Sequence, residues 1–348
     1  GKTSNRGIEL SVNVDVINKG DFRFNVGAIY NYNRNKLDEL PNADQYLYSS
    51  YWGSSSLVPT NDYMFVEGKA IGLVRGFISE GYYTVDDFNY TNGQYVLKEG
   101  VPDITKALTA TYMHPYDLPA GQTAFPGAAK FRDVDESGTV DLDDATCLGE
   151  VMPRHTGSFQ LNFNYKNFDL STNFNWTAGG KVYNVAAMIN ASGQEFDGIG
   201  AQRASWVADA FKVYNVNAAG DLYAVTNPDE LRTLNANAKY HLPYHQSGIT
   251  SSEWLENGSY LRLQTLTLGY TLPKNWLTKV HVDKIRLYLT ATNLFTITGY
   301  SGIDPEVNAN PTGQSGFYSD LRIFPTLNMD FGTYPRARTF TFGANITF

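Results

Sequence analysis

The sequence has 348 residues, of which 14% are aromatic and only 18% charged, and its formal net charge is −8 at pH 7. This acidic balance argues against nucleic acid as a partner, because phosphate binding needs an excess of Lys and Arg. The single cysteine, Cys147, excludes an internal disulfide. A mean hydropathy of −0.33 fits a soluble β-protein. It fits a membrane β-barrel equally well, because only alternate barrel residues face lipid.

Strand patterning begins with the first residues. The segment 1–10 lacks the apolar core of a signal peptide, so we expect the chain to begin inside a longer protein. Apolar and polar residues alternate from Ile8 to Val16, a tight turn follows at 18–21, and alternation resumes from Phe22 to Tyr32. This period of two predicts a long hairpin with one apolar and one polar face.

The remaining strands are expected in chain order. Two short ones fall near 63–67 and 71–82, and a second long hairpin turns at Lys166-Asn167. The strand at 260–272 changes phase, and a one-residue β-bulge near Gln264-Thr265 would restore a single apolar face. Strands ending at Ala291 and Phe348 bring the expected number to about nine.

The connections alternate in length. Residues 18–21 and 166–168 are tight turns and 273–282 is a short link, whereas the long loops cover 36–60, 83–156, 181–257 and 296–335. Short turns on one side and long loops on the other are typical of outer-membrane barrels, whose long loops are extracellular. The sequence therefore predicts an all-β, antiparallel transmembrane β-barrel with a periplasmic C-terminus. Nine strands is an odd number, so further strands must come from outside this sequence.

Three segments carry a family resemblance: Asn257–Pro273, Ile285–Phe295 with its continuation to Glu306, and Gly332–Gly343. Together they resemble the closing segment of the SusC-like TonB-dependent transporters of Bacteroidetes. Asn5–Leu10 and Tyr165–Leu170 resemble earlier strands of the same family. The resemblance implies that residues 1–348 form the C-terminal portion of one TonB-dependent receptor barrel domain, whose plug domain is not in this chain.

The resemblance also implies a function. The whole protein would be a 22-stranded outer-membrane importer that takes up oligosaccharides or oligopeptides, energised through TonB and assisted by a SusD-like surface lipoprotein. From the residues themselves we find no catalytic constellation, so we do not expect an enzyme. Two alternatives stay open: a passive outer-membrane porin, and a surface β-rich glycan-binding module.

An Asp-rich stretch stands out within residues 128–150, which we interpret as an extracellular loop insertion. From Asp133 onward it fits the 12-residue calcium-loop template, with Gly138 at the sharp turn. The last position is an Asp instead of the usual Glu, which favours weaker binding or magnesium. We therefore predict a structural calcium or magnesium ion whose ligands are Asp133, Asp135, Ser137, Thr139, Asp141 and Asp144.

Two further sets of residues are candidates for binding roles. The final strand resembles the C-terminal signal read by the barrel-assembly machinery, with Thr341, Gly343, Ile346 and Phe348 as its key positions. Aromatic side chains in long loops can stack on sugar rings or cover peptide side chains. The aromatic candidates for substrate contact are Tyr46, Tyr48, Tyr51, Trp52, Tyr82 and Tyr83. Packing and interfacial girdles are the competing interpretation for these aromatic residues.

Overall fold

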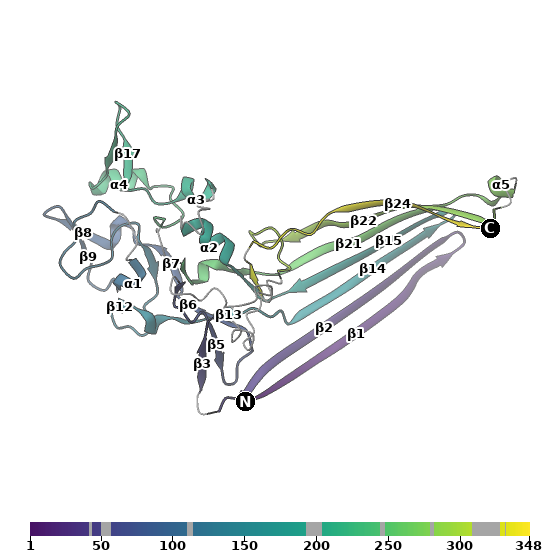
Figure 1. Cartoon of the computed structure of the whole chain (residues 1–348), viewed down its shortest axis with the longest axis horizontal. Helices are drawn as coiled ribbons and strands as arrows, with labels where there is room; N and C mark the ends of the chain where they lie inside the picture. Colours follow the sequence, from purple (N-terminus) through teal and green to yellow (C-terminus); the bar gives the residue numbers. More distant parts are fainter. Residues whose placement is uncertain are drawn as a thin grey trace, which may run out of the picture.

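The structure is a computed structural model that describes residues 1–41, 44–49, 57–109, 114–192, 204–243, 248–278, 282–307, 328–330 and 332–348. A long sheet occupies one half of the molecule, and a region of shorter elements covers one end of it (Figure 1). We call this second region, built from residues 44–151, 181–257 and 299–330 as far as they are described, the cap region.

Seven strands form the long sheet, and every neighbouring pair is antiparallel. In spatial order they are β1 (Lys2–Lys19), β2 (Phe22–Glu39), β14 (His155–Tyr165), β15 (Phe168–Ala178), β21 (Tyr260–Thr271), β22 (Lys284–Thr298) and β24 (Thr339–Thr347). The described residues make an open sheet, not a closed barrel, with β1 and β24 as its edges. The turns of the first two hairpins and the helix α5 (Lys274–Leu277) lie at the end away from the cap region (Figure 1).

The register explains why the sheet has two different faces. Ile8 lies opposite Tyr32 and Val12 opposite Ala28, so the apolar residues of both strands project to one side. This side stays open to its surroundings: Ile8 is 60% exposed and Phe342, on the last strand, is 73% exposed. A contiguous apolar face of this extent marks a surface that contacts lipid or another protein.

The expected β-bulge in the fifth strand of the sheet is confirmed. The pairing of β21 with β22 shifts register between Leu263 and Thr265, and its pairing with β15 shifts beside Phe174. Gln264 is the extra residue. Its insertion keeps Leu263 and Leu266 on the same face although their spacing is odd.

The expectation of nine strands in one sheet is wrong for the described residues. The short strands near 63–67 and 71–82 exist as β5 (Tyr63–Val66), β6 (Leu73–Gly76) and β7 (Ser79–Tyr82), but they pair within the cap region. In the long sheet, β14 pairs directly with β2. The physical reason is burial, since Tyr63 and Val74 are fully enclosed by neighbours and have no face to offer to lipid. The expected antiparallel direction of the long strands is unaffected, because β14 and β2 are antiparallel neighbours.

Short elements build the cap region around two apolar clusters, one including Phe77 and Tyr95 and the other Tyr63 and Met188. Its remaining strands are β3 (Gln45–Tyr48), β4 (Leu57–Val58), β8 (Phe88–Thr91), β9 (Gln94–Leu97), β10 (Asp103–Ile104), β11 (Ala129–Phe131), β12 (Thr139–Val140), β13 (Thr146–Glu150), β16 (Lys181–Asn184), β17 (Tyr214–Val216), β18 (Leu222–Ala224), β19 (Gly248–Ile249), β20 (Leu255–Asn257) and β23 (Met329–Asp330). Its helices are η1 (Val85–Asp87), α1 (Lys106–Thr109), η2 (Leu142–Asp144), α2 (Val185–Ser192), α3 (Ala204–Asp209), α4 (Pro228–Leu234) and η3 (Ser252–Trp254).

The end of the first hairpin is fastened to the cap region. Pairing between β2 and β14 stops at Tyr32, so residues 33–39 continue beyond the neighbouring strand. The backbone of Leu37 there exchanges hydrogen bonds of 2.8 and 2.7 Å with Lys69 and Gly68 of the cap region. In addition, Asn35 Oδ1 accepts a hydrogen bond of 2.7 Å from the amide of Ile71. Sheet and cap region therefore share a hydrogen-bonded joint besides the chain connections.

Among the described residues, no helix is long and apolar enough to cross a membrane.

Candidate functional site

The polar face of the sheet is held together by side-chain hydrogen bonds that run across the strands. Asn25 donates to Asn13 at 2.7 Å and to Asp15 at 2.9 Å on the neighbouring strand. Ser171 Oγ lies 2.6 Å from Asn162 Oδ1. Amide and hydroxyl groups of this kind hydrogen-bond equally well with water. This face is therefore suited to line a hydrated space, whereas the opposite face is apolar.

One charged cluster lies where the polar face meets the cap region. Arg262 is 2% exposed, and its guanidinium donates to Asp304 at 2.5 Å and to Glu306 at 3.0 Å. Its Nε also donates to Thr296 Oγ1 at 3.0 Å. A buried guanidinium is tolerated because its donors meet carboxylate and hydroxyl oxygens. The cluster ties residues 304–306 to the sheet.

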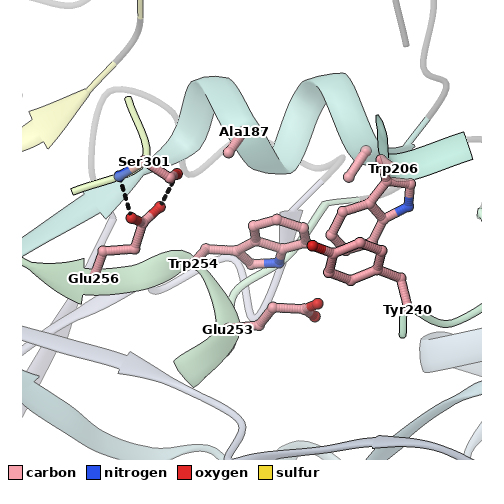
Figure 2. Close-up of a pocket in the computed structure, with 8 residues that line it drawn as sticks. Ala187, Trp206, Tyr240, Glu253, Trp254, Glu256 and Ser301 are labelled. Carbon is pink, nitrogen blue, oxygen red and sulfur yellow. Dashed lines mark hydrogen bonds between the residues drawn. The ribbon is translucent and has the colours of Figure 1, made fainter. Parts of the chain in front are cut away.

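A pocket of about 170 Å³ lies in the cap region, lined by Ala187, Ala191, Trp206, Tyr240, Glu253, Trp254, Glu256 and Ser301. We call it the aromatic pocket. The rings of Trp206 and Tyr240 stack with centroids 3.9 Å apart, and Trp254 lies 5.1 Å from Trp206. Figure 2 shows these three rings side by side, with the carboxyl group of Glu253 next to them. Stacked aromatic walls beside carboxyl groups suit a ligand with both apolar and polar surfaces.

The two glutamates of the aromatic pocket differ in their partners. Glu256 accepts hydrogen bonds of 2.7 Å from Asn184 Nδ2, from the hydroxyl of Ser301 and from the backbone amide of Ser301 (Figure 2 shows the last two). Three donors fix this carboxylate in place. Asn184 in turn accepts a hydrogen bond of 2.9 Å from the amide of Ala187, which connects the glutamate to the start of α2.

Glu253 has a different environment. Burial raises the pKa of its carboxyl group to about 7. Burial also lowers the pKa of the neighbouring His241 to about 4. The nitrogen Nε2 of His241 lies 3.7 Å from Glu253 Oε2, but between these two pKa values both groups are uncharged, so the contact is not an ion pair. Glu253 therefore changes charge near neutral pH inside the aromatic pocket.

The structure brings together part of the predicted metal loop. One carboxylate oxygen from each of Asp133, Asp135 and Asp144 lies within 4.8 Å of the others. The other predicted ligands serve the loop backbone: Asp141 accepts from the amide of Asp143 at 2.8 Å, and the carbonyl of Thr139 accepts from the hydroxyl of Ser137 at 3.0 Å.

Backbone amides account for the tight shape of this loop. Gly138 donates to Asp133 at 2.7 Å, and Val134 donates to the fully buried Asp144 at 2.6 Å. Hydrogen bonds from Ser137 lower the pKa of Asp135, which keeps this carboxyl charged. Three converging carboxylates supply the hard oxygen donors that calcium and magnesium prefer, so the residues fit the predicted ion.

The predicted aromatic contacts separate into three groups. Tyr48 and Tyr83 are 3% and 0% exposed, so burial assigns them to packing, in contrast to the expected ligand surface. Tyr82 is half-buried and its hydroxyl donates to the carbonyl of Ala238 at 3.1 Å, whereas Tyr46 is exposed. The other two predicted contacts, Tyr51 and Trp52, lie outside the described residues.

The predicted assembly-signal residues lie on and just after β24, the edge strand of the sheet. Ile346 and Phe348 are exposed, and Thr341 pairs with Thr290. Gly343 lies opposite Tyr288, and a Cβ atom at this glycine would come within 2.4 Å of the Tyr288 ring. The glycine therefore leaves room for that ring.

No family model matches the chain. Among curated relatives, TonB-dependent receptor P3 of Formosa agariphila is 29% identical over 349 residues, a match that covers the whole chain and 29% of the relative. TonB-dependent receptor SusC of Bacteroides thetaiotaomicron is 24% identical, again over the whole chain and over 27% of that protein. Over its whole length the chain is similar to SusC-like TonB-dependent receptors.

Solved structures share the fold of this chain. The RagAB peptide transporter aligns with 99% of the chain and 29% of its own, with a TM-score of 0.61 and 19% sequence identity. The mostly β structure therefore corresponds to part of a TonB-dependent barrel. TonB-dependent receptors reside in the bacterial outer membrane and are not enzymes. The chain spans less than a third of the length of these relatives.

The aromatic pocket was not predicted from the sequence. Its rings come from Trp206, Tyr240 and Trp254, which lie on separate segments with no shared spacing. Only the fold brings them together. Arg262 carried a weak signal in the sequence. It is a charged residue between Leu261 and Leu263, at a strand position where the polar face was expected.

Proposed function

We propose that this chain forms the C-terminal part of the barrel of an outer-membrane importer that takes up oligosaccharides or oligopeptides with energy transmitted by TonB. The observation that carries the proposal is the two-faced sheet, with exposed apolar residues on one side and the hydrogen-bonded polar residues Asn13, Asn25, Asn162 and Ser171 on the other. Lipid on the first side and a hydrated substrate path on the second would satisfy both faces.

Strand length supports this orientation. The apolar positions of β1 run from Ile8 to Val16, which is about 26 Å along an extended strand. A barrel strand is tilted, and the apolar band around outer-membrane barrels is about 25 Å tall. The cap region, which includes the Asp-rich stretch 128–150, would then face the outside of the cell. The turn at 20–21 and the C-terminus at Phe348 would face the periplasm.

The remaining parts of the importer follow from the family. The rest of a 22-stranded barrel, a plug and the segment that contacts TonB would come from outside this sequence. A SusD-like surface lipoprotein would cover the extracellular opening. RagAB, which shares the fold of this chain, is a peptide transporter, and this likeness supports a peptide as cargo. In our proposal the aromatic pocket and the exposed Tyr46 contribute to cargo contact, because aromatic faces cover both sugar rings and peptide side chains.

For the Asp-rich loop we propose a structural calcium or magnesium ion. Asp133, Asp135 and Asp144 would provide carboxylate oxygens, and Ser137, Thr139 and Asp141 would complete the set. When bound, the ion would neutralise the clustered negative charge and stiffen the loop. For Thr341, Gly343, Ile346 and Phe348 we propose a role as the signal that directs barrel assembly.

Uptake in living cells tests the proposed function. Cells that carry or lack the whole receptor would be given fluorescent oligopeptides and oligosaccharides, each with and without functional TonB. We expect loss of uptake of one of these two classes when either the receptor or TonB is missing. Uptake that persists without TonB would instead indicate a porin. A receptor that never enters the outer membrane would indicate a surface binding module.

A further inference from the structure

The apolar face of the first hairpin ends abruptly in basic residues. Ile8 and Tyr32 form the last apolar pair toward the cap region, and the next pair on the same face is Arg6 opposite Arg34. Lys36 follows on that face, opposite Ser4. Because side chains alternate strictly along a strand, both arginines project to the apolar side and not to the polar one.

The pairing of the two arginines is unfavourable in itself. Residues directly opposite on one face have Cβ atoms about 5 Å apart, and like charges at that distance destabilise a sheet. In the described part of the chain, neither Arg6 nor Arg34 has a salt-bridge partner. An anion between the two guanidinium groups would turn this repulsion into attraction.

A pocket of about 170 Å³ is lined by Arg34 of this pair, and four of its nine lining residues are basic. Arg34, Lys36, Lys69 and Arg154 line it, with Glu150 as the one acidic residue. Arg154 is paired with Glu150 at 2.6 Å and Lys36 with Asp38 at 3.3 Å. Positive charge from Arg34 and Lys69 is left over, although the chain as a whole carries a formal charge of −8.

We propose that Arg6, Arg34 and Lys69 bind the phosphate groups of a phosphorylated glycolipid in the outer leaflet. This inference rests on the proposed function, in which the apolar face contacts lipid and the cap region faces outward. The aromatic rings of Tyr30 and Tyr32 precede the basic residues on β2, as expected at the boundary between acyl chains and headgroups. Guanidinium groups bind phosphate through two parallel hydrogen bonds, which suits this role.

The register separates this site from the proposed substrate path. The neighbouring pair, Asn5 opposite Asn35, projects to the polar face. Asn35 is already engaged there, since its Oδ1 accepts from the amide of Ile71. An acidic substrate inside the barrel would therefore meet asparagines at this height. Arg6 and Arg34 would be reached from the lipid side of the wall.

Lipid retention by the whole receptor tests the site. The receptor would be extracted from outer membranes with mild detergent, and bound lipid would be counted by native mass spectrometry. The probes are lipid A with its phosphates, dephosphorylated lipid A, and inorganic phosphate alone. We expect the wild-type receptor to retain about tenfold or more phosphorylated lipid A than dephosphorylated lipid A, because each charge-assisted hydrogen bond to a phosphate adds to affinity.

Variants assign that preference to the named residues. Arg6→Gln/Arg34→Gln/Lys69→Gln should lose the preference, whereas Lys19→Gln/Lys274→Gln, which removes cations at the opposite end of the sheet, should keep it. The single variant Arg34→Gln covers the case in which the triple variant does not fold. It should melt at a higher temperature than wild type in lipid-free detergent, because the repulsion is relieved, and should still retain less phosphorylated lipid.

Three results would overturn the site. They are equal retention of both lipid forms by the wild type, an unchanged preference in Arg34→Gln, and binding of inorganic phosphate as tight as that of the lipid. The last would indicate a site for free anions. A receptor absent from the outer membrane would overturn the proposed function together with the site. A membrane-extracted receptor that ignores the phosphates would overturn the lipid site alone.

Discussion

Arg262 Nη2 lies 2.5 Å from Asp304 Oδ1, and both side chains are almost completely buried. The same guanidinium contacts Glu306 at 3.0 Å, and Glu306 contacts Arg336 at 2.7 Å on the segment before the last strand. Three segments distant in sequence thus meet around the carboxylate of Glu306. Their meeting point lies where the sheet joins the cap region.

Replacing Arg262 should therefore strongly destabilise the contact between the sheet and residues 304–306. Arg262→Gln leaves the carboxylate of Asp304 buried without its partner, and breaking a buried pair in this way costs about 3–5 kcal/mol. We expect faster proteolysis of residues 299–307 in the purified receptor. Arg286→Gln is the control, because its pair with Asp169 has side chains 24% and 28% exposed and should cost much less. Equal protease sensitivity of the two variants would contradict a special role for Arg262.

Metal binding to the Asp-rich loop should stabilise the cap region. A ligand present at 100 times its dissociation constant adds about 2.7 kcal/mol to the native state. We expect calcium or magnesium to raise the melting temperature of the wild-type receptor, and to have no effect on Asp133→Asn/Asp135→Asn. The neighbouring Asp143→Asn is the control, since Asp143 is not part of the carboxylate cluster. Identical calorimetric titrations of all three proteins would rule the ion out.

Glu253 should make stability depend on pH in a defined window. Its pKa is about 7 in the native state and 4.5 in the unfolded chain, so the native state binds the proton more tightly. The contribution of Glu253 to stability is then full below pH 4.5 and is lost as the pH rises to 7. The loss approaches about 3 kcal/mol, at about 1.4 kcal/mol for each pKa unit. His241 acts in the opposite sense between pH 4 and 6.5, because burial depresses its pKa.

The variant Glu253→Gln separates these two effects. It should be more stable than wild type at pH 8 and similar to it at pH 4.5, as measured by thermal unfolding at both pH values. Glu256→Gln, in the same pocket, should be destabilised at pH 8, because its new amide group faces a hydrogen-bond donor in either orientation. A Glu253→Gln variant that is less stable than wild type at pH 8 would disprove the raised pKa.

Gly343 and Phe348 should affect barrel assembly for different reasons. Gly343→Ala places a Cβ atom 2.4 Å from the Tyr288 ring, so we expect reduced receptor levels in the outer membrane. The second change Tyr288→Ala should restore them by removing the ring. Phe348→Ala should also reduce levels, but Tyr288→Ala should not rescue this variant. Rescue of both variants, or of neither, in fractionated membranes would contradict the assignment of a steric role to Gly343 and an assembly-signal role to Phe348.

Much of the sheet was predictable from its residues. The alternation around Ile8 and Phe22 specified hairpins and faces, because a one-residue slip would turn every apolar side chain to the wrong side. Even the bulge at Gln264 was readable, as a break of phase between Leu263 and Leu266. These signals are local, and a sheet with one apolar face repeats them in every strand.

The cap region was not predictable in the same way. Short apolar segments such as Tyr63–Val66 suit a barrel strand and a buried strand equally well, and only their partners decide between them. Tyr48 and Tyr83 were candidates for substrate contact, with packing as the alternative, and only the fold shows that both are buried. Trp206 and Trp254 meet through folding alone. The convergence of the carboxylates of Asp133, Asp135 and Asp144 was the exception, because these residues lie within one stretch of twelve.

The fastened end of the first hairpin has a mechanical consequence. Residues 33–39 continue past the neighbouring strand, and Leu37 is bonded through its backbone to Gly68 and Lys69. If the cap region tilts while these bonds hold, the projecting part of the hairpin must bend with it. A bent antiparallel ribbon resists deformation along its whole length and returns when released. The hairpin would then bend elastically. Tilting of the cap region would meet a restoring force that grows with the tilt, instead of a single bond that breaks.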